Sequence, residues 1–204
     1  TGGDTGEAIE VAGVAGLDLS VFSLVLYNGS NGTTYNTIAL SGVLPNQQNG
    51  FGITSFDLPT NGLQNGSPDG IALVDAEGNV IQFLSYEGTL EATNGPALGM
   101  TSEDVGVSEP SSTPVGHSLQ LAGDGVKYSD FTWEAAAANT FDAVNTNQTF
   151  AGGGDGEEPG ECCDEITLIH AVQGSGDASP LDGDTVKIEG VVSATFANIS
   201  GFFV

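Results

Sequence analysis

Three aspartates in one Gly- and Ser-containing segment are the residues of this sequence best suited to bind a metal ion. Asp177, Asp182 and Asp184 lie within residues 174–184. Carboxylate and carbonyl oxygens are the ligands that Ca²⁺ takes, about six to eight at a time. The segment differs from an EF-hand loop, which needs glutamate at its twelfth position. The sequence leaves two interpretations open, a Ca²⁺ site or a solvated turn between strands.

The remaining polar residues form no obvious catalytic set. His117 and His170 are the only histidines, and they lie far apart in the sequence, so we predict that each packs locally rather than activates a nucleophile. Glu10 and Asp18 could act as paired carboxylates only if the fold brought them together in a cleft. We therefore predict that this chain contains no catalytic residue.

Aromatic and sulfur side chains add two further candidates. Trp133 and the phenylalanines near the end of the chain could stack on bases, but no basic residues accompany them, so we predict that they belong to the core; these phenylalanines are Phe196, Phe202 and Phe203. Cys162 and Cys163 are the only cysteines. A disulfide between neighbours is strained, so partners beyond Val204, a vicinal bridge and free thiols all remain possible.

The charge balance is strongly acidic. The chain has 27 acidic residues against two lysines, Lys127 and Lys187, and a formal net charge of −25. Nucleic acids are bound largely through lysine and arginine, which replace condensed counterions, so we expect this segment to meet DNA only through the full-length protein. Because no run of 18 apolar residues occurs, we predict no membrane span.

The elements that must position these residues are predicted to be strands. Short apolar runs separated by Gly, Asn and Ser predict three hairpins: Ser23 to Tyr27 with Thr33 to Leu40, Ile71 to Val74 with Val80 to Leu84, and Ser118 to Leu121 with Phe131 to Glu134. Residues 71–74 are all apolar, which predicts a central strand covered on both faces. Only Glu134 to Ala138 has a helical composition. The fold class is therefore predicted to be all-β.

A composition change predicts two domains. Residues 1–150 are predicted to form a β-sandwich, and residues 151–164 an acidic, Gly-rich linker with little apolar surface to bury. Residues 165–204 contain strand-like segments with alternating apolar and polar positions. About forty residues are too few for an ordinary independent domain, so we interpret 165–204 as the truncated first part of a second β-domain.

Several segments resemble a known family. Residues 1–150 resemble the bacterial lamin-tail domain in the segments Glu10–Ser20, Ser23–Asn28, Asn65–Val74, Gln82–Gly88, Ser118–Leu121 and Phe131–Trp133. The resemblance implies an immunoglobulin-like sandwich, here without a buried disulfide and with one edge strand expected to be missing before Glu10. Residues 165–204 resemble the OB-like domain of large secreted bacterial nucleases in the segments Gln173–Leu181, Val186–Val192 and Gly201–Val204.

The resemblance implies a function as well as a fold. In that family a metal-dependent catalytic domain of the endonuclease/exonuclease/phosphatase type, which uses Mg²⁺, follows the OB-like domain. We therefore expect this chain to be a non-catalytic accessory or targeting region of a secreted, extracellular bacterial nuclease, with the catalytic domain in the same polypeptide. The alternative hypothesis is a cell-surface adhesion module that binds a protein, a glycan or an envelope or matrix component with the help of Ca²⁺.

Overall fold

The computed structural model describes residues 5–151, together with Ala194–Thr195 and Phe202–Phe203. Its contacts divide the chain into two units, Thr1–Gly156 and Glu157–Val204. In the second unit β11 (Ala194–Thr195) pairs antiparallel with β12 (Phe202–Phe203). The predicted linker and most of the predicted second β-domain lie outside the described residues.

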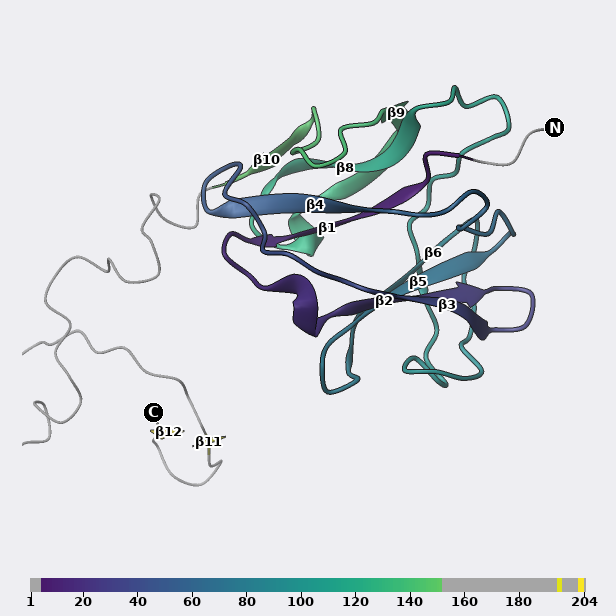
Figure 1. Cartoon of the computed structure of the whole chain (residues 1–204), viewed down its shortest axis with the longest axis horizontal. Coiled ribbons are helices and arrows are strands. Elements are labelled where there is room, and N and C mark those ends of the chain that lie inside the picture. Colours follow the sequence, from purple (N-terminus) through teal and green to yellow (C-terminus); the bar gives the residue numbers. More distant parts are fainter. Residues whose placement is uncertain (1–4, 152–193, 196–201, 204) are drawn as a thin grey trace, which may run out of the picture. The chain divides into compact units, whose positions relative to one another are not determined.

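The largest sheet of the first unit has five strands in the order β3-β2-β5-β6-β7 (Figure 1). Its strands are β2 (Ser23–Asn28), β3 (Thr33–Ala39), β5 (Asp69–Val74), β6 (Val80–Tyr86) and the short β7 (Glu103–Asp104). β2 pairs antiparallel with β3, and β5 pairs antiparallel with β6. Two of the three predicted hairpins are thereby confirmed, because turn-forming residues end each strand.

The central strand β5 is covered on both faces, as its apolar sequence predicted. Ala72 and Val74 belong to one core cluster, which also contains Tyr27 and Phe83. Leu90 from the segment after β6 packs in the same cluster, so a loop covers this face. The intervening residues of β5, Ile71 and Leu73, pack against a second cluster on the opposite face.

That second cluster lies between the five-stranded sheet and a two-stranded sheet. The smaller sheet pairs β1 (Ala8–Val14) antiparallel with β4 (Phe51–Asp57), and Figure 1 shows these two strands above β2 in the view. Leu19, Leu24 and Leu44 are each at most 2% exposed in this cluster. Burying one such side chain contributes about 1.5–3 kcal/mol. Two packed sheets around this core give the unit a sandwich-like architecture.

A third sheet has the order β10-β8-β9. Its strands are β8 (His117–Gly125), β9 (Thr132–Ala138) and β10 (Gln148–Phe150). The third predicted hairpin is confirmed, because β8 pairs antiparallel with β9 and places Leu121 opposite Trp133. The predicted helical character of Glu134 to Ala138 is wrong. Alanine favours a helix only weakly in a segment this short, and pairing with β8 overrides it.

Two 3-10 helices, η1 (Leu19–Val21) and η2 (Tyr128–Asp130), connect strands. Among the described residues, no helix has the length and apolar character needed to cross a membrane.

Phe150 joins the third sheet to the turn before β4. Its ring stacks on Phe51 at 5.1 Å between centroids and meets Phe131 edge-on at 5.5 Å. Its backbone N–H donates to the Gln48 side chain, and its carbonyl accepts from Asn49 Nδ2 at 2.7 Å. Phe150 is only 3% exposed. The last described strand of the module is therefore held by both packing and hydrogen bonds.

Candidate functional site

The predicted metal ligands Asp177, Asp182 and Asp184 lie outside the described residues, so a Ca²⁺ site there remains a prediction. The same holds for His170, Phe196 and the two cysteines, Cys162 and Cys163. Phe202 and Phe203 form β12. Within the described residues, no group of three or more His, Cys, Asp or Glu side chains is arranged to hold a metal ion.

The candidate pair Glu10 and Asp18 is separated by the fold into two different environments. Asp18 precedes η1, where its Oδ1 accepts a hydrogen bond from Ser20 N at 2.9 Å. That hydrogen bond lowers the pKa of Asp18. Asp18 therefore serves as a helix cap, and the structure gives Glu10 a different carboxylate neighbour.

Glu10 meets Asp142 where β1 approaches the loop that follows β9. Glu10 Oε1 accepts from Asp142 N at 2.9 Å, and Asp142 Oδ1 accepts from Ser55 N at 2.7 Å. The pKa of Glu10 is raised to about 7, chiefly by burial; the hydrogen bond from Asp142 N–H opposes the rise, and the Asp142 charge adds a smaller increase. Glu10 thus titrates in the range where a general acid or base operates, but the contacts around it are structural.

A second polar cluster holds the loop of residues 59–68. Asp69 is 1% exposed, and its carboxylate accepts from Gly29 N at 2.9 Å and from Gly66 N. A Cβ on Gly29 would lie 1.7 Å from Pro68 O, and one on Gly66 would lie 2.6 Å from Asp69 Oδ2. Gly29 therefore lets the end of β2 lie against the Pro68 backbone, and Gly66 lets the loop backbone approach the buried carboxylate.

Side chains from three other parts of the sandwich complete this cluster. Gln64 N donates to Tyr35 Oη at 3.1 Å, while the Tyr86 hydroxyl donates to Gln64 O. Glu7 Oε2 accepts from Gly62 N at 2.8 Å. Burial raises the pKa of both Tyr35 and Tyr86, so both phenols stay protonated at neutral pH. We name Glu7, Tyr35, Asp69 and Tyr86 the loop clamp, because these groups are satisfied by the backbone of the loop.

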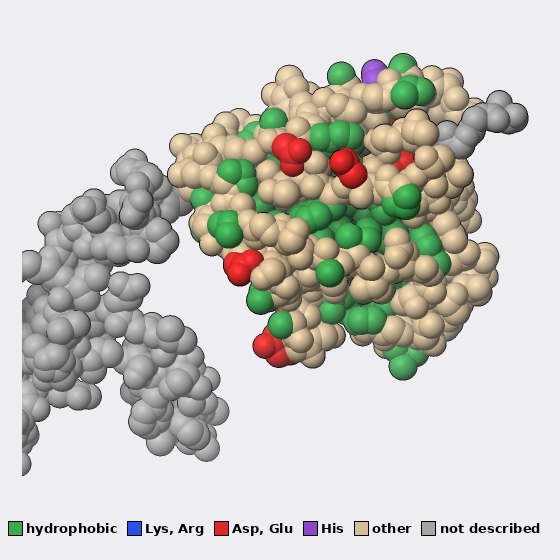
Figure 2. Space-filling view, viewed as in Figure 1, with side chains coloured by type: hydrophobic (Ala, Val, Ile, Leu, Met, Phe, Trp, Pro, Cys, Tyr) green, Lys and Arg blue, Asp and Glu red, His purple; other side chains and the backbone are tan. Residues whose placement is uncertain are grey.

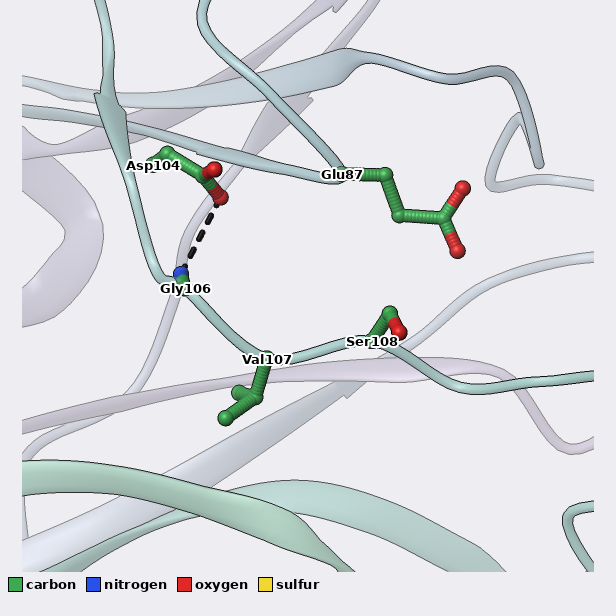
Figure 3. A pocket seen from close by; sticks show the side chains of 5 residues that line it. All are labelled: Glu87, Asp104, Gly106, Val107 and Ser108. Atoms are coloured by element: carbon green, nitrogen blue, oxygen red, sulfur yellow. Dashed lines mark hydrogen bonds between the residues drawn. The ribbon is translucent and has the colours of Figure 1, made fainter.

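An open depression of about 350 Å³ lies beside Glu87 and Asp104 and is lined also by Gly106, Val107 and Ser108 (Figure 3). Asp104 Oδ1 accepts from Gly106 N at 3.0 Å, which closes a local turn. Figure 3 shows the Glu87 side chain extending away from Asp104. The two carboxylates do not converge on a common point, so the depression lacks the geometry of an acid–base pair.

His117 and Trp133 lie in the paired strands β8 and β9. Both side chains are half-buried. Trp133 Nε1 donates to Tyr128 Oη at 3.0 Å. The predicted core position of Trp133 is therefore only partly right, because its indole packs against the sheet and keeps a polar contact near the surface.

Sequence reasoning missed Asp142, Tyr35 and Tyr86. Asp142 lies 132 positions from Glu10 in the sequence, and no local pattern links them. The segment Asn65–Val74 gave a partial signal, because it contains both Gly66 and Asp69. Comparisons with protein-family models, with curated proteins and with solved structures found no match.

Proposed function

We propose that residues 5–151 are a non-catalytic accessory module of a secreted bacterial nuclease, with an immunoglobulin-like topology of the lamin-tail kind. Catalysis is assigned to a Mg²⁺-dependent domain beyond Val204. The observation that supports this proposal best is the position of the Asn65–Val74 segment. It contributes the buried Asp69 that organises the loop clamp, and then the central strand β5.

The other segments that resemble the lamin-tail family also fall on structural elements of the sandwich. Glu10 lies on β1, residues 23–28 form β2, and residues 82–86 lie within β6. A family resemblance that followed surface loops alone would support the proposal less, because loops vary more among related proteins than the strands they connect.

Charge supports an accessory role rather than direct contact with DNA. Lys127 is the only lysine or arginine between residues 5 and 151. Several carboxylates of the module instead accept backbone hydrogen bonds, as Glu7, Glu10 and Asp69 do. An acidic module repels the substrate of its own catalytic domain, so its expected task is to tether or space that domain.

DNA degradation assays test the assignment of catalysis. The 204-residue chain and the full-length protein are incubated with linear duplex DNA and Mg²⁺, with EDTA as the control. We expect cleavage only by the full-length protein, and loss of it in EDTA. Metal-dependent cleavage that copurifies with the folded 204-residue chain would contradict the proposal, as would a full-length protein without nuclease activity.

A deletion tests the accessory role separately. The full-length protein lacking residues 1–151 is expected to cleave a short duplex at the rate of the intact protein but to bind isolated cell envelopes less. An equal loss of cleavage on the short duplex, with folding of the catalytic domain verified by its melting temperature, would assign the module to catalysis instead.

A further inference from the structure

The strand β9 presents an open backbone edge. It pairs with β8 on one side, and within the described part of the chain its backbone has no hydrogen-bond partner outside β8. Five of its seven residues are exposed: Thr132, Glu134, Ala135, Ala137 and Ala138. An edge of this kind offers a row of N–H and C=O groups to another extended chain.

The free edge of β4 differs from that of β9, because hydrogen-bond partners already occupy its backbone groups. Gln47 Oε1 accepts from Ile53 N at 2.8 Å, and Gln47 Nε2 lies 3.3 Å from Ile53 O. Asp142 Oδ1 accepts from Ser55 N, and Phe51 N donates to Gln48 O at 2.9 Å. Side chains and a turn therefore occupy the groups of β4 that would otherwise bind a foreign strand, whereas β9 has no such cover in the described residues.

A groove accompanies the open edge. It has a volume of about 190 Å³ and runs over β8 and β9, with Gln120, Ala122, Ala137 and Asn147 among its lining residues. The alanines leave space above the sheet, so a strand added at β9 can place an aliphatic side chain near the groove. Strand addition combines backbone hydrogen bonds with pockets for alternate side chains.

The acidic charge of the chain indicates what kind of strand could bind at the β9 edge. Glu134 is exposed in the middle of β9, where its Oε2 accepts from Asn147 Nδ2 at 3.2 Å, and acidic side chains are scattered over the face drawn in Figure 2. A second copy of this chain would bring another net charge of −25 to the interface. A cationic segment gains from the same field, and a lysine opposite or diagonal to Glu134 forms a favourable cross-strand pair. We propose that β9 binds an extended, lysine-bearing peptide segment of a partner protein by strand addition.

The probe is a capped peptide of about eight residues that alternates valine and lysine, a length that spans β9. A peptide that alternates valine and glutamate is its control. Trp133 is the only tryptophan and lies on β9, so its fluorescence reports binding to the 204-residue chain. Hydrogen exchange locates the site, and we expect the lysine peptide to slow exchange at amides of residues 132–138.

Glu134→Lys tests the position, and Glu77→Lys is the matched control because Glu77 is exposed in the turn between β5 and β6. A charge reversal at a cross-strand pair is expected to weaken peptide binding about three- to tenfold, whereas the control changes it less than about twofold. The melting temperature of each variant verifies that it folds.

Four results of the peptide experiments would overturn the proposal, and a fifth comes from the chain alone. The first is an absence of lysine-peptide binding, and the second is protection that maps outside β9. The third is an equal effect of Glu134→Lys and Glu77→Lys, and the fourth is equal binding of the glutamate peptide. Sedimentation of the chain alone supplies the last check, because self-association that protects residues 132–138 would make a second copy, rather than a cationic peptide, the occupant.

Discussion

Glu10 is expected to make the sandwich less stable as the pH rises, and replacing it by glutamine should remove that loss. The Glu10 carboxyl has its pKa raised from an ordinary 4.5 to about 7, chiefly by burial. Glu10→Gln keeps an oxygen that can accept from Asp142 N but cannot ionise. The variant therefore separates the cost of the charge from the loss of the hydrogen bond.

The sign follows from proton binding in the two states. Between pH 4.5 and about 7 the unfolded chain has lost the Glu10 proton while the folded chain retains it. The free energy of unfolding then falls as pH rises. This loss is absent below the unfolded pKa and complete above the folded one.

The size of this loss in the free energy of unfolding can be bounded from the folded and unfolded pKa values of Glu10. Each pH unit between them corresponds to about 1.36 kcal/mol, which gives about 3 kcal/mol for the whole interval. Glu10 is only half-buried, and solvent screening reduces the effect to about 1–2 kcal/mol. For a unit of this size we expect the variant to melt about 3–6 °C higher than the native chain at about pH 8.

The assay is thermal unfolding of the full chain, followed by Trp133 fluorescence at about pH 4 and about pH 8. Glu77→Gln serves as the control, because it also removes one acidic residue but at an exposed position. We expect Glu10→Gln to match the native chain at the lower pH and to exceed it only at the higher pH. Equal gains for both variants at pH 8 would refute the reasoning, since general charge repulsion would then explain them.

Three further predictions concern the loop clamp and the acidic segment of residues 174–184. Gly29→Ala should destabilise the module by about 2–4 kcal/mol in urea unfolding, because the new Cβ would lie 1.7 Å from Pro68 O. Gly42→Ala is the control, since Gly42 has a φ of +92 but no atom within 4 Å of the new Cβ. It should cost only about 1–2 kcal/mol. Asp69→Ala should cost about 1–3 kcal/mol, because it removes the buried carboxylate that accepts from Gly29 N and Gly66 N. Asp69→Asn should cost less in the same assay; equal losses would contradict the clamp. If Asp177, Asp182 and Asp184 bind Ca²⁺, calorimetry at constant ionic strength should show heat of Ca²⁺ binding that Asp182→Asn with Asp184→Asn abolishes, whereas identical titrations for both chains would identify an ordinary turn.

The strands were predictable from sequence where turn residues and side-chain alternation agree. The segments around Asn28–Gly32 and Ala76–Asn79 combine both signals, and the hairpins β2–β3 and β5–β6 form there. Residues 71–74 predicted a central strand because a run of apolar side chains must be covered on both faces. These features depend on neighbours that are close in sequence.

The wrong helix prediction and the missed contacts depend on residues that are far apart in the sequence. Residues 134–138 have the composition of a helix, but β8 supplies hydrogen bonds that the isolated segment lacks. Glu10 and Asp142 meet only because β1 pairs with β4 and the loop after β9 reaches β4. In the sequence, Tyr35 and Tyr86 have the pattern of ordinary strand residues. Their hydroxyls bond the backbone of Gln64 only when the loop of residues 59–68 is folded.

The attachment of Phe150 has a mechanical consequence. The chain leaves the described module one residue later, at Ala151, whose N–H donates to Gly125 O at 2.9 Å. A pull on the following segment is first borne by the parallel β8–β10 pairing, by the side chains of Gln48 and Asn49 on the Phe150 backbone, and by the Phe51 ring. Tension along the chain is thus divided between β8, through its pairing with β10, and the turn before β4, through Gln48 and Asn49.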